Sequence, residues 1–164
     1  MPKHVVMEKL PEVLEALQGE ERELIFSAPV WISLFAAYRH DGEIDPAEKS
    51  EAIKQAHFRT FTSPNALHAY YEVVDDHFED KFNNFNAALP DGEEARDKFL
   101  EDKIHKIVDV VKNLPDEWLS KVMMEDLNEF YLKVFRADSN IFQYFALPLI
   151  SKRFEKDDEN LDEI

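Results

Sequence analysis

The 164-residue chain contains no cysteine, which excludes disulfide bonds, thiolate metal sites and cysteine nucleophiles. It also lacks any apolar run near the roughly 20 residues that span a bilayer, and its N-terminus lacks the apolar stretch of a signal peptide. A chain without thiols is typical of a reducing compartment. We therefore expect a cytoplasmic protein that does not insert into a membrane.

Positive charge is scarce as well. The sequence has 19 Lys and Arg against 35 Asp and Glu, a net charge of −16, and no run of basic residues. Such a chain is repelled by phosphate backbones, so nucleic acid is excluded as a partner. Cations and basic protein surfaces remain, although the acidity could also serve solubility alone.

Glycine is rare, with three residues, whereas Glu, Lys, Leu and Ala are common, a composition that favours helices. Apolar residues recur every three or four positions, and no segment alternates with the period of two that marks a strand. The sequence therefore predicts an all-α bundle of about seven helices. We expect one domain over residues 1–154 and a flexible acidic tail over residues 155–164.

Proline, glycine and aspartate separate the predicted helices. The segment from Val30 to Tyr38 is apolar on nearly all sides and should form the buried centre. Most of the aromatic side chains, Phe58 and Phe61 among them, are assigned to the core on their helical spacing. The predicted helices cover residues 11–18, a short segment ending near 26, and residues 27–39, 46–61, 63–89, 92–114, 115–137 and 139–154.

One turn between two predicted helices carries a recognisable motif. Asp41-Gly42-Glu43-Ile44-Asp45, followed by Glu48, resembles the second half of an EF-hand loop, in which glycine permits a sharp turn and a glutamate closes the site. The three carboxylates could hold Ca²⁺ or Mg²⁺. Alternatively, Asp45 and Glu48 cap the next helix and Asp41 stabilises the turn. Gly42 should adopt a positive φ in either case.

A second, weaker copy of this turn lies further along the chain. Tyr38-Arg39-His40-Asp41-Gly42-Glu43-Ile44 aligns with Phe135-Arg136-Ala137-Asp138-Ser139-Asn140-Ile141, which indicates an internal duplication of the helix–turn–helix. The second copy has Ser139, Phe142 and Phe145 where the first has Gly42, Asp45 and Glu48.

The paired turns resemble the TerB-like family, named for a tellurite-resistance protein. The resemblance implies an all-helical domain that pairs two helix–turn–helix units around a buried hairpin. It also implies a non-enzymatic, stress-associated or scaffolding role. An acidic metal site is implied at Asp41, Asp45 and Glu48, with Asp138 from the second copy.

No motif supports catalysis. His68, Glu72 and Asp76 are spaced by fours and could share a metal, but they lie off the apolar stripe of their helix, which favours a solvated face. No nucleophile elbow, phosphate loop or zinc-protease motif is present. We expect an acidic interaction or scaffold domain that binds a protein partner, with homo-oligomerisation left open. The alternative is a divalent-cation sensor or buffer that uses the Asp41–Glu48 turn.

Overall fold

The chain folds as a bundle of helices in a computed structural model, which describes residues 10–44 and 46–135. These residues form seven α-helices, one short 3-10 helix and no strand, so the all-α prediction is confirmed for them. The predicted helix over 139–154 and the tail over 155–164 lie outside the described residues. The α-helices are α2 (Glu12–Ala16), α3 (Gly19–Phe26), α4 (Ala28–Asp41), α5 (Pro46–Thr62), α6 (His68–Ala87), α7 (Glu93–Lys112) and α8 (Glu117–Phe135).

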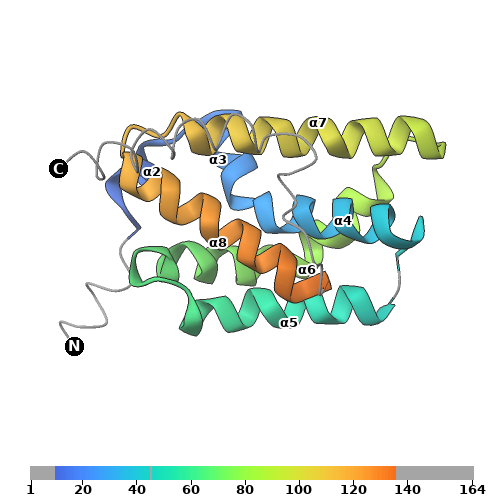
Figure 1. Ribbon diagram of the computed structural model, residues 1–164, viewed down its shortest axis with the longest axis horizontal. Coiled ribbons are helices and arrows are strands. Elements are labelled where there is room, and N and C mark those ends of the chain that lie inside the picture. Colours follow the sequence, from blue (N-terminus) through green and yellow to red (C-terminus); the bar gives the residue numbers. More distant parts are fainter. Residues whose placement is uncertain (1–9, 45, 136–164) are drawn as a thin grey trace, which may run out of the picture.

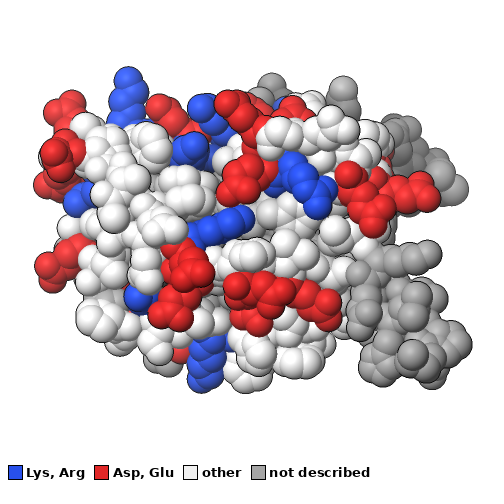
Figure 2. All heavy atoms as spheres, turned by 180° about the vertical axis from the view of Figure 1, so that it is seen from behind, with Lys and Arg blue, Asp and Glu red and all other residues white. Residues whose placement is uncertain are grey.

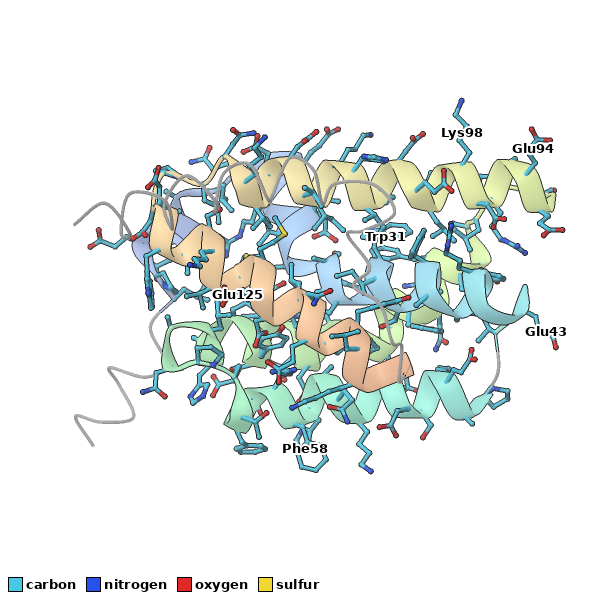
Figure 3. The ribbon with its side chains drawn as sticks, viewed as in Figure 1. Trp31, Glu43, Phe58, Glu94, Lys98 and Glu125 are labelled. Carbon is cyan, nitrogen blue, oxygen red and sulfur yellow. The ribbon has the colours of Figure 1, made fainter. Side chains whose placement is uncertain are left out.

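Helix α4 forms the buried centre, as its apolar sequence predicts. It lies between α7 and α5 in Figure 1 and contacts α6, α7 and α8. Trp31, which is labelled on α4 in Figure 3, stacks on Phe85 of α6 with ring centroids 4.3 Å apart and meets Phe99 of α7 edge-on at 5.8 Å. The indole therefore joins three helices through close-packed aromatic contacts.

Most helices begin close to their predicted positions. Pro46 opens α5, and the backbone N–H of Leu119 donates to Asp116 Oδ1 at 3.0 Å, which caps α8. The start of α6 differs from the prediction, because residues Asn65–Leu67 form a 3-10 helix before α6 begins. Pro64 has an extended ψ of 144°, so no α-helix starts at this proline.

The Asp41-Gly42 turn ends a helix. Helix α4 continues through Asp41, and Gly42 follows it as the C-cap with a φ of 72°, which confirms the expected positive φ. The N–H of Gly42 donates to the carbonyl of Tyr38 at 2.8 Å. This left-handed glycine cap is the usual way to close a helix, and it needs no metal ion.

Acidic side chains predominate on the surface. In Figure 2, which shows the rear face, red and blue side chains are interspersed with uncharged surface, and no cluster of blue dominates.

Among the described helices, none is long and apolar enough to cross a membrane.

Two aromatic side chains assigned to the core are exposed, so the prediction is wrong for them. Phe58 is 46% and Phe61 is 69% exposed on α5. The inward face of α5 presents Ala52, Ala56 and Arg59 instead, all of them buried. The buried face of α5 is therefore formed by two alanines and an arginine, and the two phenylalanines lie on its outer face.

Candidate functional site

The predicted acidic site is only partly within the described residues. Glu48 lies in the first turn of α5, and Asp41 is the last residue of α4. Asp45 and Asp138 lie outside the described residues, and so does the side chain of Asp41. Among the described residues, no group of three or more His, Asp or Glu is arranged to hold a metal ion.

A positive charge lies at this same turn. Arg96 of α7 donates through Nη1 to the carbonyl oxygen of Gly42 at 3.3 Å, and its guanidinium lies 4.1 Å from the centroid of the Tyr38 ring. Arg96 also pairs with Asp97 at 3.0 Å. The arginine therefore attaches the turn to α7, and Asp97 balances its charge.

We therefore expect weak calcium binding or none. A tight site needs six to eight oxygen ligands, and a turn with three carboxylates falls in the weak range of about 10⁻⁴ to 10⁻³ M. The check is calorimetric titration of Ca²⁺ into the wild type, Asp41→Asn and Glu48→Gln. Submicromolar binding that is lost in both variants would contradict the expectation and favour the cation-sensor alternative.

The acidic face of α6 agrees with the prediction of a solvated face. Glu72 and Asp76 are exposed. His68 instead makes a local contact, with Nε2 2.6 Å from the carbonyl oxygen of Ser63. His57 on α5 pairs with Asp75 on α6 through Nδ1 and Oδ2 at 2.9 Å. Both histidines thus have structural partners.

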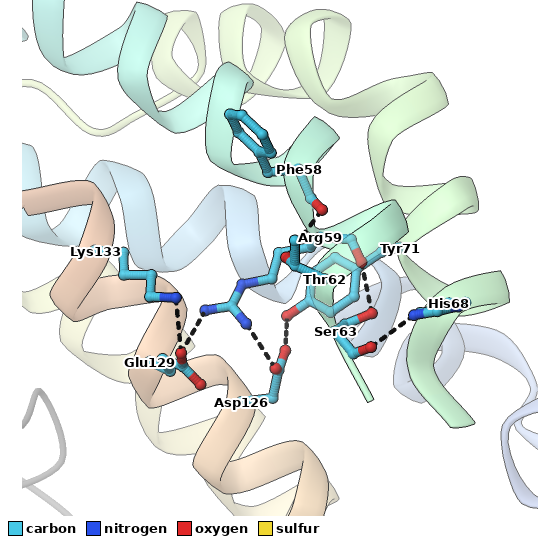
Figure 4. Close-up of polar contacts among 9 residues, drawn as sticks. All are labelled: Phe58, Arg59, Thr62, Ser63, His68, Tyr71, Asp126, Glu129 and Lys133. Carbon is cyan, nitrogen blue, oxygen red and sulfur yellow. Dashed lines mark hydrogen bonds and ion pairs between the residues drawn. The ribbon is translucent and has the colours of Figure 1, made fainter. Parts of the chain in front are cut away.

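A buried polar cluster, which the sequence motifs do not indicate, connects α5, α6 and α8 (Figure 4). Arg59 and Asp126 are 2% and 3% exposed, and Nη1 donates to Oδ1 at 3.0 Å. The hydroxyl of Tyr71 donates to the other oxygen of Asp126. At the edge of the cluster, Arg59 Nη2 lies 3.6 Å from Glu129, which pairs with Lys133 at 2.9 Å.

Burial sets the protonation of this cluster. It raises the pKa of the Tyr71 hydroxyl well above its usual range, which keeps the hydroxyl neutral and able to donate. Burial also raises the pKa of Asp126, an effect that Tyr71 and Arg59 oppose by stabilising the carboxylate. Arg59 and Asp126 are almost wholly buried, so their ion pair joins α5 to α8 in the interior of the bundle.

The described surface is hollowed where α2 and α3 meet the end of α7. The groove has a volume of about 570 Å³. Most of its interior is apolar, and three carboxylates stand among its lining residues. These residues are Glu12, Val13, Ala16, Leu17, Glu21, Asp109, Val110, Asn113, Leu114 and Pro115. We refer to this feature as the α2–α7 groove.

One wall of the groove is the five-residue helix α2, which is too short to be stable alone. Its buried Leu14 anchors it to the core. Arg22 of α3 donates to the carbonyl oxygens of Leu14 and Glu15 at 3.1 and 3.5 Å, so it satisfies free acceptors at the end of α2. These contacts hold Val13 and Leu17 in the groove lining.

The opposite wall is the turn from α7 to α8. Asn113 Nδ2 donates to the carbonyl of Asp109 at 2.8 Å, and the buried Ser120 hydroxyl donates to the carbonyl of Val111 at 2.7 Å. Val110 and Leu114 supply apolar lining on this side. Since both walls are fixed by hydrogen bonds, the groove is largely formed before any ligand binds.

The charged residues that line the groove are all acidic. Glu12, Glu21 and Asp109 line it, and no Lys or Arg of the described chain does so. An apolar interior with acidic residues around it suits a ligand that presents apolar side chains flanked by positive charge. A phosphate or carboxylate ligand would be repelled.

No protein-family model, curated protein or solved structure matches the chain.

Proposed function

We propose that this protein is an acidic interaction domain, of TerB-like type, that binds a protein partner in the α2–α7 groove. The observation that carries the proposal is the groove itself, an apolar hollow of about 570 Å³ lined by Glu12, Glu21 and Asp109. The partner segment is apolar with flanking Lys or Arg residues, since these groups complement the lining and the net charge of −16.

The turn at Gly42 supports the TerB-like component of the proposal, because it joins two packed helices as the resemblance implies. We assign this turn a structural role, with Gly42 as a helix cap and Arg96 as its attachment to α7. A stress-associated scaffolding role belongs to the same proposal and rests on the resemblance.

The test uses two fluorescein-labelled synthetic helical peptides, one composed of Leu, Ala and Lys and one with Glu in place of every Lys. Fluorescence anisotropy should show binding of the Lys peptide and none of the Glu peptide. Asp109→Lys should weaken binding about fivefold to tenfold, which corresponds to roughly 1 to 1.4 kcal/mol.

The matched control is Glu94→Lys, which makes the same charge change at the other end of α7 (Figure 3). This variant should bind the Lys peptide nearly as the wild type does, because Glu94 is remote from the groove. Equal weakening in the two variants would show a response to net charge alone, and absence of any binding would reject the proposed function.

A further inference from the structure

The outer face of α5 presents aromatic and basic side chains together. Phe58 and Phe61 are 46% and 69% exposed, and Lys54 and His57 are exposed on the same face, since positions three and four apart are neighbours on a helix. We call these four residues the α5 stripe. Trp118 on α8 is the other exposed large hydrophobic residue among those described. Paired exposed aromatics of this kind are typical of an interaction surface.

Neighbouring side chains of the α5 stripe contact one another. Lys54 Nζ lies 5.9 Å from the centroid of the Phe58 ring, and the His57 ring meets Phe61 edge-on with centroids 5.5 Å apart. On the opposite side of α5, Arg59 is fixed by Asp126, and Figure 4 shows Phe58 pointing away from that contact. Ordered side chains lose less conformational entropy on binding, which favours association.

The side chains of the α5 stripe complement the lining of the α2–α7 groove. Two phenyl rings supply apolar groups for an interior lined by Val13, Leu17 and Leu114. Lys54 supplies the positive charge that complements the acidic lining. We propose that the α5 stripe of one chain inserts into the α2–α7 groove of a second copy, an inference that rests on the proposed function and names its partner.

Two different surfaces make this contact, so it is heterologous. The groove is formed by α2, α3 and the α7–α8 turn, whereas Phe58 points outward from α5 on the opposite side of the bundle (Figure 3). A chain bound through its groove still presents a free stripe, and further copies add head to tail. The net charge of −16 on each copy opposes growth, so the assembly is weak and depends on protein concentration.

The test is sedimentation velocity on the full chain over a concentration series, with two blocking variants. Phe61→Glu changes an exposed residue and blocks the stripe. Ala16→Trp fills the groove from an exposed helical position without changing the charge. The wild type should grow beyond dimers as concentration rises, and each variant alone should remain monomeric. An equimolar mixture should form a dimer and nothing larger, because it retains one intact groove and one intact stripe per pair.

Several outcomes would overturn the inference. These are a wild type that stays monomeric at the highest concentration reached, a mixture that stays monomeric, or a variant that dimerises alone. Asn83→Glu is the control and should assemble as the wild type does, because it adds the same charge as Phe61→Glu at an exposed position of α6 outside both surfaces. The Lys peptide separates this inference from the proposed function. Peptide binding that survives in Phe61→Glu and is lost in Ala16→Trp supports the groove even if the mixture fails to dimerise.

Discussion

Asp126→Asn should lower the free energy of unfolding by about 3 to 5 kcal/mol, as expected when one member of a buried ion pair is removed. The substitution keeps the size of the side chain but leaves the charge of Arg59 buried, with Glu129 at 3.6 Å as its remaining ionic partner. It also weakens the bond from Tyr71, which then faces a neutral acceptor. Urea unfolding followed by circular dichroism gives the value.

Two variants separate the buried charge from other effects. Glu129→Gln acts at the half-exposed edge of the cluster and should cost less than about 1 kcal/mol. The double variant Arg59→Met and Asp126→Leu should recover part of the loss, because apolar side chains of similar size often replace a buried pair without cost, whereas the Tyr71 hydroxyl is left without its acceptor. A small loss in Asp126→Asn, or a double variant less stable than the single one, would contradict the role of the cluster as a clamp between α5 and α8.

Trp31→Ala should cost about 3 to 5 kcal/mol, the range for removing a large aromatic side chain from a core. Trp31 is 7% exposed and contacts Phe85 and Phe99, so its loss leaves a cavity where α4, α6 and α7 meet. Lys103, whose Nζ lies 5.0 Å from the Trp31 ring centroid, loses a cation–π contact as well.

The second tryptophan provides a matched control for this measurement. Trp118 is 62% exposed on the first turn of α8, so Trp118→Ala should change stability by no more than about 0.5 kcal/mol. Thermal and urea unfolding of the two variants would compare the same substitution at a buried and an exposed position. Similar losses at both positions would contradict the assignment of α4 as the buried centre.

The sequence predicts the helices well because its signals are local. The apolar run from Val30 to Tyr38 indicates a buried helix, and residues 28–37 are all buried. Pro46 and Gly42 mark a helix start and a helix end through constraints on their own backbone, which do not depend on the rest of the fold.

The buried cluster could have been predicted from helical spacing. Arg59 shares a face of α5 with Ala52 and Ala56, and Asp126 shares a face of α8 with Met123 and Phe130, all of them buried. A single charge on each buried face, of opposite sign, indicates an ion pair between the helices. Helical spacing is a weaker sequence signal than the concentration of acidic residues in the Asp41–Glu48 turn.

Phe58 and Phe61 show the limit of spacing as evidence. Their separation fits a core face and an exposed face equally well, and the opposite face of α5 is the buried one. The α2–α7 groove has no local signal at all, because its walls come from segments about 100 residues apart that only the fold brings together.

The measurement that tests the central claim most directly is nuclear magnetic resonance mapping of the Lys peptide on the isotope-labelled chain. We expect the largest shifts to cluster at Val13, Leu17, Val110 and Leu114, with smaller changes at the turn around Gly42. Shifts concentrated at the Gly42 turn, or spread evenly over acidic residues, would contradict the claim that the α2–α7 groove is the binding site.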